Sequence, residues 1–202
     1  MKNKRSSITA AIIIVIIVIT VFTILYSEYK KLTKPFLKCN DHILTAIEYE
    51  YFYNSYRNHY INTYSAFFDY MGVDSEIELD DQEYEDGMTF AEMFAKATDE
   101  QIKETYALYD DGIKQGFIYD SQNAFDEYLK AVTESCNQQG TSTLAYFRAF
   151  YGDRITEKNI REYMSRGFYA AAYYDEITGS MGADGAYIYL DELKKQYEIT
   201  YY

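Results

Sequence analysis

The sequence contains no tryptophan, one proline, two histidines and two cysteines among 202 residues. Because histidine and cysteine are so scarce, and because no CxxC or HExxH motif occurs, no transition-metal site is predicted. A glycine-rich phosphate-binding loop is also missing. His42, in a predicted turn, and His59, in a predicted helix, could act as a base or a ligand, or could simply pack. No motif therefore indicates an enzyme, and we expect no cofactor.

Basic residues are outnumbered, with 19 Lys and Arg against 32 Asp and Glu, and every acidic residue follows Ser27. A surface of this sign repels phosphate backbones and anionic lipid headgroups. We therefore expect no nucleic-acid partner. The 25 tyrosines and 12 phenylalanines in turn exclude a disordered tail, since disordered segments are poor in aromatic residues.

A run without charge, mostly Ile and Val, extends from Ile8 to Leu25. Crossing about 30 Å of hydrocarbon takes roughly 20 helical residues, so this run predicts a transmembrane signal-anchor over 8–26. A cleaved signal peptide is the alternative, but no small-x-small cleavage site follows the run. The predicted organisation is a cytoplasmic tail 1–7, the anchor 8–26, a linker 27–35 and one folded domain 36–202.

The orientation of the anchor does not follow from charge alone, because the two flanks are nearly balanced in Lys and Arg. The flanking cations are Lys2, Lys4 and Arg5 before the run and Lys30, Lys31, Lys34 and Lys38 after it. The very short N-terminal tail favours a C-terminal domain outside the membrane. We therefore expect a single-pass protein of the cell membrane with an extracytoplasmic domain.

Cys39 and Cys136 lie almost a hundred residues apart in the sequence. In an oxidising compartment they could form a disulfide worth about 2–4 kcal/mol. The alternative is two unpaired, buried thiols. Cys136 falls on the apolar face of a predicted helix, which suits either case.

Beyond the linker, the hydrophobic spacing and the helix-start signals predict a mainly α domain of about six helices. The helices are expected from Thr45 to about Phe68, from Thr89 to near Gly116, from 120 or 121 to near Gly140, from Ser142 to Gly152, from Thr156 to near 179, and over about 186–196. Capping boxes are predicted at Thr45 with Glu48 and at Thr89 with Glu92. The small-residue segment 179–185 predicts a break.

Acidic residues alternate along 74–86. Such spacing can indicate a calcium loop, but an EF-hand needs glycine at its sixth position, where Leu79 stands. A solvated loop is therefore the prediction here.

The first helix carries aromatic residues around almost its whole circumference. A helix on a protein surface needs an apolar stripe of only about 100°, so some of these rings should be accessible. Tyrosine offers a large contact area with a polar tip that tolerates water. The alternative is that all the rings are core. The candidate client-binding residues are Tyr49, Phe52, Tyr53, Tyr56, Tyr60, Tyr64 and Phe67.

Several short motifs follow one another in a familiar order. They are CNDHILTAIEY at 39–49, MTFAE at 88–92, TYALYD at 105–110, YGD and ITE within 151–157, and YLDELKKQYEIT at 189–200. In this order and spacing the chain from Phe36 onward resembles the SurA/PrsA-type extracytoplasmic chaperones, specifically the SurA N-terminal domain.

The resemblance implies a chaperone that binds unfolded or extended secreted polypeptides, with strands over Phe36–Cys39 and Glu198–Tyr202 pairing. Many family members also carry a parvulin domain of roughly ninety residues before the terminal helix, where this chain has only 179–185. Two alternatives stay open: a prolyl-isomerase-related protein whose catalytic domain is lost or degenerate, and a structural subunit of a cell-envelope complex.

Overall fold

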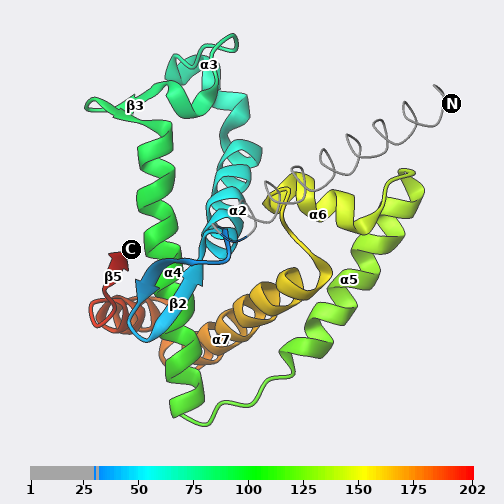
Figure 1. Cartoon of the computed structure of the whole chain (residues 1–202). Coiled ribbons are helices and arrows are strands. Elements are labelled where there is room, and N and C mark those ends of the chain that lie inside the picture. Colours follow the sequence, from blue (N-terminus) through cyan, green and yellow to red (C-terminus); the bar gives the residue numbers. More distant parts are fainter. Residues whose placement is uncertain (1–29, 31) are drawn as a thin grey trace, which may run out of the picture.

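A computed structural model describes residue 30 and residues 32–202 and shows a mainly helical fold with a few short strands (Figure 1). The predicted tail 1–7 and anchor 8–26 lie outside these residues. Within the described part, no helix combines the length and the apolar character needed to cross a membrane. The structure thus concerns the predicted domain 36–202 and the end of the linker before it.

A three-stranded antiparallel sheet joins the two ends of this domain. Its strands, in spatial order, are β2 (His42–Thr45), β1 (Pro35–Cys39) and β5 (Ile199–Tyr201). Leu37 pairs with Tyr201, and Cys39 pairs with Ile199. The predicted pairing of the N- and C-terminal strands is therefore confirmed.

Asn40, in the turn between β1 and β2, holds the C-terminal segment in place. Its φ of 49° lies in the left-handed region, which asparagine tolerates better than most residues. Its side-chain amide donates a hydrogen bond to the Gln196 carbonyl at 3.0 Å, and its Oδ1 accepts one from the Glu198 amide at 3.0 Å. One turn residue thereby aligns β5 for pairing.

The helices begin where the sequence places their caps. They are α2 (Ala46–Tyr64), α3 (Phe68–Met71), α4 (Phe90–Lys114), α5 (Ser121–Gln138), α6 (Thr143–Tyr151) and α7 (Glu157–Lys194). Their side-chain N-caps include Thr45, Thr89, Asp120, Ser142 and Thr156. The full capping box between Thr89 and Glu92 is confirmed.

Only half of the predicted capping box of α2 forms. The Thr45 hydroxyl accepts a hydrogen bond from the Glu48 amide at 3.3 Å. The Glu48 carboxylate, however, points into the core, where it binds Arg166 and accepts a hydrogen bond from the Tyr106 hydroxyl at 2.7 Å. A buried cation is a stronger partner for a carboxylate than an exposed backbone amide.

The predicted break over 179–185 is confirmed at Gly182, where the two helices that share the label α7 meet at a kink. Gly182 has a φ of 76° and a ψ of 167°, which is not helical. On both sides of Gly182 the helix continues. The two helices expected from Thr156 onward are therefore present, and they join directly at Gly182.

The acidic stretch predicted as a loop contains a small hairpin. It comprises the 3₁₀ turn η2 (Leu79–Asp81), β3 (Glu83–Glu85) and β4 (Met88–Thr89). Asp86 and Gly87 connect the strands with φ values of 52° and 78°, as a tight two-residue hairpin turn requires. The Asp-Gly pair was the sequence signal for it.

Figure 1 shows α2 and α4 running together from the sheet toward α3 and β3, which lie at the far end of the pair. We name this far end, residues 64–88, the tip; it begins with Tyr64 and the 3₁₀ turn η1 (Ser65–Phe67). Helix α7 packs against α4 and α5. The tip is thus held away from the sheet by two long helices.

Candidate functional site

The seven aromatic residues predicted to bind clients fall into a packed group and an exposed pair. Tyr64 and Phe67 are 45% and 57% exposed. The packed group, buried or half-buried, consists of Tyr49, Phe52, Tyr53, Tyr56 and Tyr60. The packed rings therefore lie within α2, whereas the exposed pair lies at its last residue, Tyr64, and in the 3₁₀ turn η1.

Phe94 of α4 is the centre of the packed rings near the tip. Its ring centroid lies 6.1 Å from that of Tyr53, 6.3 Å from that of Tyr56 and 5.5 Å from that of Tyr60. Edge-on aromatic pairs at such distances stabilise beyond their area burial. These rings therefore fasten α2 to α4.

A polar contact also fixes the loop of the tip to α2. Asp80 accepts a hydrogen bond from the Tyr53 hydroxyl at 2.9 Å and an ion-paired hydrogen bond from Arg57 Nε at 2.6 Å. Burial, together with the bond to Asp80, raises the pKa of Tyr53. The tip is thus anchored through both rings and charges.

Beyond these anchors the tip exposes large apolar side chains to solvent. Tyr70 is 90% exposed, more than any ring predicted from the sequence as client-binding. We name the set Tyr64, Phe67, Tyr70, Met71 and Ile77 the tip patch. The last three were not among the predicted residues, because they lie in or beside the stretch interpreted as a solvated loop. Apolar side chains concentrated in so short a segment are typical of interaction surfaces.

The tip is also acidic without any compensating basic residue in its own segment. Between Arg57 and Lys96 the sequence has no Lys or Arg. The acidic residues in that interval are Asp69, Asp74, Glu76, Glu78, Asp80, Asp81, Glu83, Glu85, Asp86 and Glu92. The tip therefore carries an excess of negative charge, partly offset by Arg57 at Asp80 and by Lys96, whose Nζ lies 3.2 Å from Met88 Sδ.

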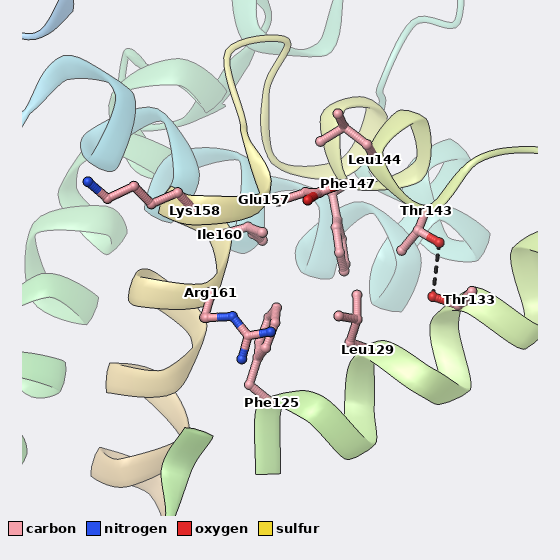
Figure 2. A pocket seen from close by; sticks show the side chains of 10 residues that line it. All are labelled: Phe125, Leu129, Thr133, Thr143, Leu144, Phe147, Glu157, Lys158, Ile160 and Arg161. Carbon is pink, nitrogen blue, oxygen red and sulfur yellow. Dashed lines mark hydrogen bonds between the residues drawn. The ribbon is translucent and has the colours of Figure 1, made fainter. Parts of the chain in front are cut away.

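A cavity lies between α5, α6 and the start of α7 (Figure 2). The cavity has a volume of about 410 Å³. Its lining is apolar at the bottom and polar at the edge, and comprises Phe125, Leu129, Thr133, Thr143, Leu144, Phe147, Glu157, Lys158, Ile160 and Arg161. A space of this size and composition can receive one or two apolar side chains.

Two contacts define the walls of this cavity. The Arg161 guanidinium lies 4.6 Å from the centre of the Phe125 ring and forms an ion pair with Asp126 at 2.7 Å. The hydroxyls of Thr133 and Thr143 are 3.0 Å apart and join α5 to α6. In the sequence, Phe125 and Leu129 read as ordinary core positions, so nothing there indicated a cavity.

Cys39 and His42 are paired across the β1–β2 hairpin. A cysteine next to a histidine can act as a nucleophile if its thiol is deprotonated. His42 Nε2 lies 3.0 and 2.8 Å from the two carboxylate oxygens of Asp110, which also accepts a hydrogen bond from the Tyr197 hydroxyl. Cys39, however, is completely buried, and burial raises its thiol pKa to about 11. A thiol that remains protonated is a poor nucleophile, so this cluster serves to join β2, α4 and the C-terminal segment.

Both cysteines are free and buried in the structure. Of the two alternatives that the sequence allowed, a Cys39–Cys136 disulfide or two unpaired thiols, the structure has the two unpaired thiols. Cys136 lies on the apolar face of α5, as expected from its helical position.

Among residue 30 and residues 32–202, no group of three or more His, Cys, Asp or Glu side chains is arranged to hold a metal ion. No protein-family model, no curated protein and no solved structure matches this chain. The resemblance to SurA/PrsA-type chaperones therefore rests on the sequence motifs and stays a prediction.

Proposed function

We propose that this chain is a membrane-anchored, extracytoplasmic chaperone-like protein that binds unfolded or extended secreted polypeptides through the tip patch. The observation that carries the proposal is the concentration of exposed large apolar side chains between Tyr64 and Ile77. Tyrosine and phenylalanine rings give large contact area at low cost in side-chain entropy. They therefore suit partners that vary in sequence.

The support beneath the tip patch favours this function. The rings packed around Phe94 and the contacts of Asp80 hold the tip on two long helices. A rigid platform reduces the entropy lost when a partner binds. The anchor over 8–26, predicted from the sequence, would hold this platform at the outer surface of the membrane.

The test is suppression of aggregation by the full chain in lipid nanodiscs. Denatured test proteins, one basic and one acidic, are diluted into buffer, and light scattering is followed. We expect suppression of at least one of them. The triple variant Tyr64→Ser, Phe67→Ser, Tyr70→Ser should lose most of this activity while its circular dichroism spectrum stays unchanged.

The matched control is Tyr187→Ser with Ile188→Ser, which removes exposed apolar side chains from α7, outside the tip. It should suppress aggregation as well as the unchanged chain does. Absence of suppression at several-fold excess of the full chain over either test protein would overturn the proposal. Equal loss in the tip variant and the control would also overturn the assignment of the site.

The same exposed patch supports a second candidate, a structural subunit that docks one fixed partner in a cell-envelope complex. Affinity capture separates the two functions: a chaperone recovers many polypeptides in small amounts, whereas a structural subunit recovers one partner in stoichiometric amount. For the third possibility, an isomerase-related protein, the segment 179–185 is the kinked junction within α7 and holds no separate folded domain. A proline-peptide isomerisation assay tests it directly.

A further inference from the structure

We infer that the tip patch selects polypeptide segments that combine apolar side chains with lysine or arginine. This inference rests on the proposed function and names the class of partner. It follows from the charges around the patch. The apolar surface alone would accept an apolar segment whether its flanking residues were basic or acidic.

Exposed apolar residues of the patch have acidic residues as their immediate neighbours in the sequence. Asp69 precedes Tyr70, and Ile77 lies between Glu76 and Glu78. The side chains of Glu76 and Glu78 are exposed and make no ion pair or hydrogen bond in the structure. A partner that lays an apolar side chain on Ile77 or Tyr70 therefore brings its neighbouring residues next to unpaired negative charge.

The negative charge extends through the whole tip and has little internal compensation. Asp80 is neutralised by Arg57, but the remaining acidic residues of the tip have no Lys or Arg of their own segment nearby. Charges within roughly 8 Å of one another act together at physiological ionic strength. A cationic segment gains attraction from several of these carboxylates, and an anionic segment is repelled by the same ones.

Charge also decides against two other occupants of the patch. A second copy of this chain, placed tip to tip, would bring two equally acidic surfaces together. An anionic bilayer would meet the same repulsion. The tip therefore fits a cationic, apolar polypeptide segment, and it would be held free of the membrane surface and of its own copies.

The direct test uses two fluorescent peptides with the same tyrosine and leucine content, one carrying four lysines and the other four glutamates at the same positions. Binding to the full chain in nanodiscs of uncharged lipid is measured by anisotropy. We expect the lysine peptide to bind at least roughly tenfold more tightly at low salt, and this preference to shrink as salt screens the charges. Equal affinity of both peptides would overturn the inference while leaving the proposed function intact. Binding of neither peptide would overturn both.

A charge-removal variant locates the effect. Glu76→Gln, Glu78→Gln and Glu85→Gln change exposed side chains that support no other group in the structure. This variant should weaken binding of the lysine peptide roughly threefold or more and bring the affinities of the two peptides together. The control, Glu134→Gln, Asp175→Asn and Glu176→Gln, removes the same number of exposed charges outside the tip. An equal effect of the control would show that net charge, and not the tip, sets the preference.

Discussion

Glu48 and Arg166 form a buried ion pair that joins the first turn of α2 to the N-terminal part of α7. Tyr106 of α4 completes the contact, since its hydroxyl donates to Glu48 and accepts from Arg166 Nη1 at 2.6 Å. The guanidinium also lies 4.8 Å from the centre of the Tyr106 ring. Three helices that are distant in the sequence thus meet at one charged centre inside the core.

Replacing one member of this centre should be strongly destabilising. Arg166→Met leaves the Glu48 carboxylate buried without a cation, which we expect to cost about 3–5 kcal/mol of the free energy of unfolding. Urea unfolding followed by circular dichroism measures the loss. The control is Glu162→Gln, which removes the exposed second partner of Arg166 and should change stability by about 0.5 kcal/mol or less. Similar losses in both variants would contradict the central role of the buried pair.

Two helical glycines should respond in opposite directions to alanine. A Cβ at Gly112 would lie 2.8 Å from Tyr169 Cε1 and 3.1 Å from Tyr173 Cγ, whereas one at Gly167 would meet nothing within 4 Å. Gly112→Ala should therefore destabilise by about 1–3 kcal/mol through overpacking. Gly167→Ala should stabilise by about 0.5–1 kcal/mol through lower backbone entropy in the unfolded chain. Thermal unfolding midpoints of the two variants give the signs, and equal signs would contradict the packing described for α4 and α7.

The cysteines should react only after unfolding. Because both thiols are free and buried, and because burial raises the pKa of Cys39 to about 11, we expect negligible alkylation of the native protein at pH 8. Denaturation without a reducing agent should then release two reactive thiols per chain, counted by mass spectrometry. No reactive thiol after denaturation would show that the pair forms a disulfide in the protein as isolated.

Alkaline pH should unfold the domain in a defined range. Burial, followed by the nearby negative charge of Glu48, raises the pKa of Tyr163 from an ordinary value of about 10 to about 12, and burial raises the pKa of Tyr51 and Tyr151 as well. These tyrosines have a lower pKa in the unfolded chain than in the folded one. Their contribution to the free energy of unfolding is therefore fully present below pH 10 and is lost as the pH rises toward 12. Absorbance at 295 nm and circular dichroism should change together in that range. Tyrosine ionisation that follows a simple curve at pH 10 with the fold intact would contradict their burial.

The helix starts could be predicted because their causes are local. Thr89, Ser142 and Thr156 each cap the backbone amide three residues ahead, so a few adjacent residues contain the whole signal. The pairing of β1 with β5 joins residues more than 150 positions apart, and only the resemblance to a chaperone family pointed to it. Local chemistry thus predicted the elements better than their partners.

The errors come from contacts that no local pattern contains. Glu48 has the spacing of a capping residue, but Arg166, more than a hundred residues away, takes its carboxylate. Phe52 and Tyr53 carry the same aromatic signal as Tyr64, and only the position of α4 decides which rings become core. The cavity beside Arg161 depends on how closely α5, α6 and α7 approach one another, which hydrophobic spacing does not specify.

The sheet that closes the domain also sets the order in which the domain can be completed. β1 lies near the start of the described chain, and its partner β5 is synthesised more than 150 residues later. Until β5 arrives, one edge of β1 is open and Leu37 and Cys39 lack a neighbouring strand on that side. Long-range strand pairing is slow because a large loop must close first. During synthesis, before β5 is available, β1 therefore has an unpaired edge that can bind other chains. Such unpaired edges are the kind of surface that chaperones cover in other proteins.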